Sequence, residues 1–293
     1  MILNKKLEGI FNSKFESINL NQNHWLQGLN GSALSFFIQS LYFFNKKSIV
    51  IVASDKEKAA YLLNDLETLF THEKILFFPE SYRQPYQIEK TTNANIQERA
   101  EVLNLLSKDN FTGIVITYPQ ALAEKVTLKQ KLQQNTLQIK KGEKLSIDFI
   151  SEFLLSYDFE NVEFVFEPGQ FSIRGGIIDI FSFANEFPYR IELFGNEVEA
   201  IKTFDPADQL SNGKFDFITV IPNINSTVFT EEKALMLNYF NAKNSFLFFE
   251  DAQYALDVFD KKFETATKAF QQYAGEIKQI APDKLYSQSY ELK

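Results

Sequence analysis

Residues 32–126 contain short apolar runs separated by longer segments in which apolar residues recur with helical spacing. The apolar runs, which we interpret as strands buried on both faces, lie at 48–53, 75–79 and 112–118. The helical segments lie at 32–44, at 95–107, and from a cap at Ser54 or Asp55 to about residue 70. This alternation predicts βαβ units and a parallel sheet with helices on both faces.

The pattern changes after residue 126. A helix with Ser146 as its cap is predicted at 146–157, and apolar residues then alternate with polar ones. The alternating segments, predicted as short strands, lie at 162–166, 171–173, 175–181, 189–195 and 197–204. Turn residues between them, such as Gly195, favour an antiparallel sheet with one open face.

The earlier pattern returns from residue 214 onward. Predicted strands at 215–221 and 246–249 alternate with predicted helices at 231–242 and 251–273. The predicted fold class is therefore α/β: a parallel sheet of the P-loop type with helices on both faces, interrupted by an inserted α+β domain with an antiparallel sheet. We place the α/β domain at 1–126 and 214–293, and the inserted domain at 127–213.

Composition narrows the chemistry that this chain can perform. The 293 residues are 45% hydrophobic and carry a net charge of −8, which is ordinary for a globular protein and argues against strong non-specific nucleic-acid binding. There is no Cys, and His24 and His72 are the only imidazoles, so thiolate and His-rich metal centres are excluded. No segment reaches the ~20 apolar residues of a membrane span. The N-terminus does not read as a secretory signal, so we expect a cytoplasmic protein.

Residues 28–35 have the position, but not the full chemistry, of a phosphate loop. In the motif G-x-x-x-x-G-K-[ST], Gly28 matches the first Gly and Ser35 the final hydroxyl. Ala33 replaces the second Gly and Leu34 replaces the Lys that attracts the β- and γ-phosphates. ATP binding is therefore not expected, and Gly28 and Gly31 can equally be residues of an ordinary strand-to-helix turn. The sequence shows no catalytic group, no metal site and no cofactor site, and we interpret Asp179 as a structural carboxylate.

Two longer stretches carry a family resemblance. Residues 167–181 read EPGQFSIRGGIIDIF, and residues 188–206 read PYRIELFGNEVEAIKTFDP. They resemble the insert domain shared by the excision-repair helicase UvrB and the bacterial transcription-repair coupling factors, and the resemblance extends over essentially the whole chain. UvrB has an intact phosphate loop and a long aromatic hairpin after the second strand. Here the loop is degenerate and residues 80–94 are too few for that hairpin, which favours the N-terminal module of a coupling factor.

The resemblance implies a non-catalytic module that recruits the repair protein UvrA to DNA lesions where RNA polymerase has stalled. RNA polymerase and DNA would be bound by other domains of a longer protein, and ATP and Mg²⁺ by its motor domains. The C-terminal regulatory domain of the same protein would mask the UvrA site. The alternative is a fragment of a UvrB-type ATP-dependent repair helicase. A DNA-binding module is a third hypothesis, which the acidic charge and the scarcity of Arg oppose.

The inserted domain holds just two arginines, Arg174 and Arg190. Alternation along 190–194 places Arg190 and Phe194 on the solvent side of the predicted strand, and Ile191 and Leu193 toward the core. An aromatic ring beside arginines is typical of a binding hot spot.

The residues alone leave a structural interpretation open, in which Phe194 lies beneath a loop and the arginines pair with Glu197 or Glu199. The family resemblance implies instead that Arg174, Arg190 and Phe194 contact UvrA. We expect neither Arg190 nor Phe194 to be needed for folding.

Overall fold

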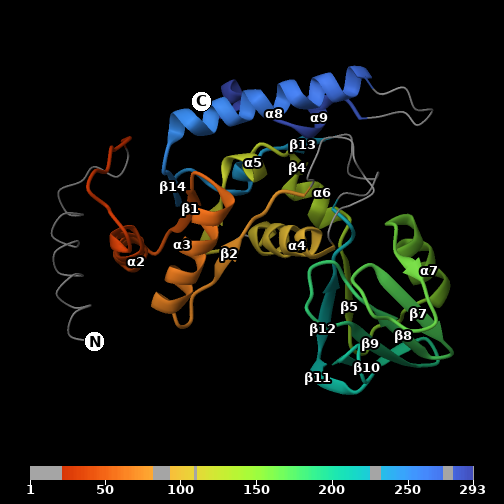
Figure 1. Ribbon diagram of the computed structural model, residues 1–293. Helices are drawn as coiled ribbons and strands as arrows, with labels where there is room; N and C mark the ends of the chain where they lie inside the picture. Colours follow the sequence, from red (N-terminus) through yellow and green to blue (C-terminus); the bar gives the residue numbers. More distant parts are fainter. Residues whose placement is uncertain (1–21, 82–92, 109–110, 225–231, 273–279, 293) are drawn as a thin grey trace.

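A four-stranded parallel sheet forms one half of the molecule (Figure 1). The computed structural model describes residues 22–81, 93–108, 111–224, 232–272 and 280–292. The strand order is β14-β1-β3-β2, with β1 at Ser48–Val52, β2 at Ile75–Phe77, β3 at Ile114–Thr117 and β14 at Ser245–Phe249. Every residue of β1 and β3 is buried, as their unbroken apolar sequences predict.

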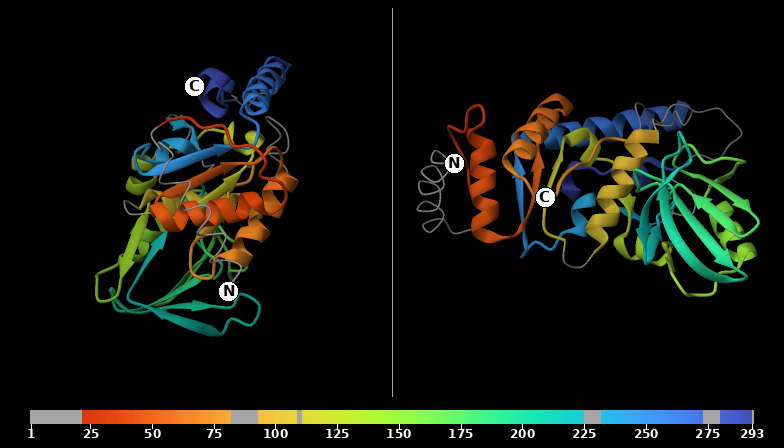
Figure 2. Two further views of the ribbon diagram at one scale, coloured as in Figure 1. Left: turned by 90° about the vertical axis from the view of Figure 1, so that its left-hand side faces the viewer. Right: turned by 90° about the horizontal axis from the view of Figure 1, so that it is seen from below.

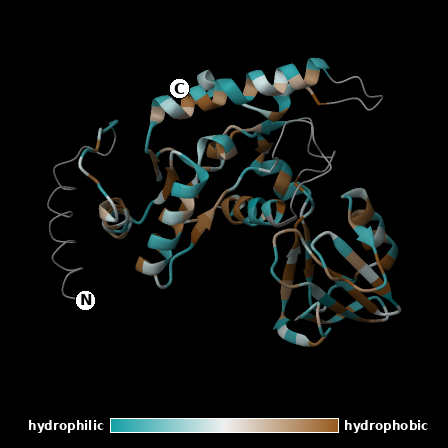
Figure 3. Ribbon diagram, viewed as in Figure 1, coloured by the Kyte–Doolittle hydropathy of each residue, from teal (hydrophilic) through white to brown (hydrophobic). Residues whose placement is uncertain are grey.

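Helices flank this sheet and complete its core. They are α2 (Ala33–Asn45), α3 (Lys56–Leu69), α4 (Asn93–Ser107) and α8 (Ala252–Gln272). The side chain of Asp55 caps α3 by accepting a hydrogen bond from Lys58 N at 2.8 Å, so Asp55 and not Ser54 is the cap. Helix α8 runs along one side of the molecule (Figure 2) and mixes hydrophilic and hydrophobic residues along its length (Figure 3). None of the described helices is long and apolar enough to cross a membrane.

A six-stranded sheet forms the second half of the molecule. Its strand order is β11-β10-β9-β8-β7-β6, and all neighbouring strands are antiparallel except the parallel pair β6 and β7. The strands are β6 (Glu160–Asn161), β7 (Gln170–Arg174), β8 (Ile177–Ile180), β9 (Tyr189–Phe194), β10 (Glu197–Phe204) and β11 (Ser211–Phe215). Helix α7 (Ile147–Ser156) precedes them and is capped by the side chain of Ser146, as predicted.

Short elements connect the two halves. Strand β5 (Leu137–Lys140) pairs with β12 (Phe217–Val220), and β4 (Val126–Thr127) pairs with β13 (Lys233–Ala234). The remaining helices in the described part of the chain are α5 (Pro119–Leu122), α6 (Lys129–Gln134), α9 (Pro282–Leu285), η3 (Met236–Tyr239) and η4 (Ser289–Glu291). Gln97 in α4 also donates a hydrogen bond to Asn185 O at 2.6 Å, which ties the parallel sheet's helices to the antiparallel half.

The predicted fold class is confirmed: a parallel sheet flanked by helices and a separate antiparallel sheet. Several element predictions are wrong. Beyond β6, residues 162–166 form no strand, and residues 233–239 form β13 and η3 in place of a long helix. Residues 217–220 pair with β5, so the next strand of the parallel sheet is β14. Most of the predicted loop at 80–94 lies outside the described residues.

Candidate functional site

Arg174 and Arg190 lie on opposite sides of the central strand β8 of the antiparallel sheet. Arg174 is the last residue of β7, and Arg190 is in β9, directly opposite Asp179 of β8. Glycine at position 176 allows this arrangement, because a Cβ there would approach the carbonyl oxygen of Leu193 to 2.9 Å. The short turn after Arg174 can therefore pack closely against β9.

Both arginines bind the same carboxylate. Asp179 is completely buried; its Oδ2 accepts from Arg174 Nη2 at 2.6 Å and from Arg190 Nη2 at 2.9 Å, and its Oδ1 accepts from Arg190 Nε at 2.8 Å. This hydrogen bonding, partly opposed by burial, raises the pKa of Arg190 above its ordinary value. The structural interpretation that the arginines pair with Glu197 or Glu199 is thus wrong in its partners. Arg190 nevertheless has a structural role, because removing it would leave a buried carboxylate with one partner fewer.

Phe194 projects into solvent at the end of β9. Its side chain is 80% exposed, whereas Ile191 on the opposite face of the strand is completely buried. Leu193 is partly buried and packs against the core. The predicted alternation along this strand is confirmed, and Phe194 does not lie beneath a loop.

A small apolar cluster covers one end of the same sheet face. It consists of Val165, Phe181 and Phe204, with Val162 packed against it. The guanidinium of Arg190 lies 4.3 Å from the centre of the Phe204 ring. The prediction that this face of the sheet is open is therefore wrong at this end. Alternation along β8 continues to Phe181 and could have signalled this cluster, because it places Phe181 on the same side as Asp179.

The degenerate phosphate loop lines a cavity of about 540 Å³. Gly28 and Gly31 both have positive φ, at 80° and 56°, and shape the turn before α2. Ala33 is the first residue of α2, and Leu34 lines the cavity where the motif would place Lys. The hydroxyl of Ser35 donates a hydrogen bond to Asp65 Oδ2 at 3.1 Å.

Glu250 and Lys58 pair with each other at the edge of this cavity. Glu250 follows β14 and accepts hydrogen bonds from Ser54 N at 2.7 Å, Ser54 Oγ at 2.6 Å and Lys58 Nζ at 2.9 Å. Burial alone would raise the pKa of Glu250, but these hydrogen bonds outweigh burial and lower it. Among the described residues that line the cavity, Lys58 is the single cation, and it is already paired. The arrangement suits a structural contact between β1 and β14 better than a phosphate site.

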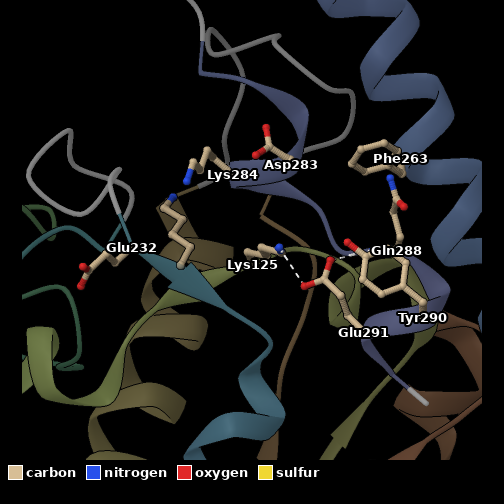
Figure 4. Close-up of a pocket in the computed structure, with 9 residues that line it drawn as sticks. Lys125, Glu232, Phe263, Asp283, Lys284, Gln288, Tyr290 and Glu291 are labelled. Atoms are coloured by element: carbon tan, nitrogen blue, oxygen red, sulfur yellow. Dashed lines mark hydrogen bonds and ion pairs between the residues drawn. The ribbon is translucent and has the colours of Figure 1, made fainter.

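A second cavity, of about 380 Å³, lies beside α8 and α9 (Figure 4) and was not predicted. Acidic and basic side chains are mixed in its lining, and Lys125 forms an ion pair with Glu291 at 2.8 Å. Burial and then repulsion from Arg99 lower the pKa of Lys233 to about 8. Among the described residues, no group of three or more His, Cys, Asp or Glu side chains could hold a metal ion.

Comparison with known proteins places the antiparallel half in a family. Residues 137–225 match the family model described as the UvrB interaction domain. The chain is 30% identical over 71% of its length to the transcription-repair-coupling factor of Bacillus subtilis, and 24% identical over 70% to that of Escherichia coli. It is therefore a relative of the transcription-repair-coupling factors. It is also 30% identical over 63% of its length to UvrABC system protein B of Ureaplasma parvum.

The chain spans less than a fifth of the two coupling factors, 18% of each, and 30% of the Ureaplasma protein. Arg174, Arg190 and Phe194 lie inside the UvrB interaction domain, whereas the degenerate loop at 28–35 lies outside it. The matched range continues past residue 213 and includes β12, in agreement with the pairing of β12 with β5.

Proposed function

We propose that this chain is the part of a transcription-repair coupling factor that recruits UvrA to DNA lesions where RNA polymerase has stalled. The observation that carries the proposal is an 80% exposed Phe194 on the same sheet face as Arg174 and Arg190, within a UvrB interaction domain. Burying a large exposed ring against a partner removes apolar area from water, and arginines beside it supply directional polar contacts. The kinship with coupling factors supplies the repair context.

The alternative function is that of a UvrB-type ATP-dependent helicase fragment, and the similarity to the Ureaplasma protein supports it. Two observations favour a non-catalytic module over this alternative. Leu34 stands where a phosphate loop needs Lys, and the Ser35 hydroxyl that would face Mg²⁺ is bonded to Asp65. We infer that this chain has no ATPase activity and needs no cofactor. In a full-length protein, other domains would bind ATP, Mg²⁺, RNA polymerase and DNA, and a C-terminal domain would mask the UvrA surface.

Binding of purified UvrA to this chain tests the proposal directly. We expect Phe194→Ala to weaken binding by roughly thirtyfold, because truncating a hot-spot side chain typically costs ~2 kcal/mol or more. Phe217→Ala is the matched control, since Phe217 is an exposed ring of the same domain that lies in another sheet. A wild-type chain that does not bind UvrA would overturn the proposed function. If Phe194→Ala and Phe217→Ala weakened binding equally, Phe194 would not be the centre of the binding surface.

A further inference from the structure

Asp179 is a buried carboxylate on the face that carries Phe194. It has no exposed surface. In register, it lies between Ser172 of β7 and Arg190 of β9. A buried carboxylate is stable only with charged or hydrogen-bonding partners, and Arg174 and Arg190 supply them. Two guanidinium groups share one carboxylate, so this cluster of three side chains carries one positive charge in excess.

The two arginines differ in how fully the protein satisfies them. Arg190 donates to Asp179 through Nε and Nη2, and to the backbone oxygen of Gln209 through Nη1 at 3.2 Å. It also stacks on the buried ring of Phe204, and its side chain is 16% exposed. Four of its five N–H groups therefore bond within the chain, since Nη2 also donates to Gln209 Oε1 at 3.4 Å.

Arg174 is more open. Its side chain is 35% exposed, with Nη2 donating to Asp179 and Nη1 donating to Ser172 Oγ at 2.9 Å and to the backbone oxygen of Glu163. No residue in the described part of the chain accepts a hydrogen bond from Arg174 Nε. In register, Ile177 lies opposite both Arg174 and Glu192, and Phe194 follows Glu192 by two residues on the same face. Arg174 thus presents a held guanidinium with a spare donor on the sheet face that carries the exposed Phe194 ring.

We propose that Asp179 is a positioning residue that holds Arg174 at the binding surface, and that Arg174, not Arg190, pairs with a carboxylate of the partner. This inference rests on the proposed function and assigns different roles to the two arginines. The partner carboxylate balances the excess positive charge of the cluster. An arginine held in place before binding loses less side-chain entropy when the ion pair forms. Arg190 remains within the cluster, where it donates two hydrogen bonds to Asp179.

A double-mutant cycle with UvrA tests whether Asp179 acts through Arg174. We expect Arg174→Ala to weaken binding about tenfold. Asp179→Asn keeps the size of the side chain but removes its charge, and we expect a loss of about fivefold. In the Arg174→Ala background, Asp179→Asn should cause no further loss, because its effect on binding requires the arginine. Circular dichroism and thermal melting identify the temperature at which each variant is folded, and binding is measured below it.

Two further variants keep the test decisive. Ser172→Ala removes a second hydrogen bond to Arg174 at a buried position; we expect a loss of about twofold to threefold that also disappears in the Arg174→Ala background. If Asp179→Asn does not fold, Ser172→Ala takes its place in the double-mutant cycle. Lys202→Gln is the control, because it removes a positive charge next to Arg190 in register without touching Asp179, and should change binding by less than about twofold.

Different results overturn different claims. Losses that multiply in the double variants would show that Asp179 supports the sheet but does not act through Arg174, and the inference would fail while UvrA binding stood. An unchanged affinity of the Arg174→Ala variant for UvrA would also overturn the inference and leave UvrA binding by the chain intact. A wild-type chain without affinity for UvrA would overturn the proposed function itself.

Discussion

Neighbouring residues of β9 have opposite environments, and single substitutions there separate folding from binding. Ile191 is completely buried and Phe194 is 80% exposed. We expect Ile191→Ala to lower the free energy of unfolding by about 2–5 kcal/mol, because it leaves a cavity in the core. Phe194→Ala should change it by less than about 0.5 kcal/mol. Urea unfolding of both variants measures the difference, and a similar loss in both would mean that Phe194 packs into the core.

Lys233 predicts a pH dependence of stability at the scale of one residue. Burial and repulsion from Arg99 lower its pKa to about 8 in the folded chain, whereas an unfolded Lys titrates near ~10.4. Between these values the unfolded state binds more protons, so the contribution of Lys233 to stability rises with pH. Below about pH 8 the amine is charged in both states, and the destabilisation that its burial causes is then at its maximum.

Lys233→Met should therefore raise the free energy of unfolding at pH 7 by about 1–3 kcal/mol. The difference from wild type should shrink as the pH rises from about 8 toward ~10.4. Urea unfolding at pH 7 and at pH 10 checks this prediction. Lys284→Met is a suitable control, since Lys284 lines the same cavity and belongs to α9. A stability difference that stays constant with pH would show that the Lys233 amine is not desolvated in the folded state.

At the scale of elements, the sequence predicts what depends on local pattern. The apolar runs identify β1, β3 and β14, and cap residues locate the starts of α3 and α7. Pairing between distant segments is not visible in this way. Residues 233–234 pair with β4, so tertiary contacts override the apparent helical preference there. Residues 217–220 form the predicted strand, but they pair with β5 and not within the parallel sheet.

The same limit applies to the candidate site. Alternation places Arg190 and Phe194 on one face of their strand, and the structure agrees. Alternation cannot show that Asp179 lies between Arg174 and Arg190, because that depends on the register of three strands. The pairing of Arg190 with the buried Asp179 depends on the same register, and it opposes the expectation that Arg190 is dispensable for folding.

The degenerate phosphate loop predicts an absence of nucleotide binding. Leu34 supplies no charge, Ser35 is bonded to Asp65, and Lys58 is paired with Glu250. Isothermal titration with ATP and Mg²⁺ should give no measurable binding. Leu34→Lys alone should not produce ATPase activity, because the other two contacts remain. A dissociation constant in the low micromolar range for the wild-type chain would contradict this prediction and favour the helicase alternative.

At the scale of the whole molecule, charge distinguishes a protein-binding module from a DNA-binding one. The chain carries a net charge of −8, and acidic residues outnumber basic ones in the UvrB interaction domain as well. Such a surface repels the phosphate backbone, while the local excess of arginine around Asp179 still suits a carboxylate of a protein partner.

We therefore expect DNA binding by this chain to be weak and unselective for damage. Typical non-specific binding has a dissociation constant of ~10⁻⁴ to 10⁻⁶ M at physiological salt, and an acidic chain should bind at the weak end of that range or beyond it. Fluorescence anisotropy with matched intact and lesion-containing duplexes, at several salt concentrations, measures both affinity and selectivity. A Phe194→Ala chain should give the same DNA-binding curve as wild type while its affinity for UvrA falls. Tight binding that prefers the damaged duplex would contradict this prediction and would make the chain a DNA-binding module. Such binding would require a basic surface that the net charge does not predict.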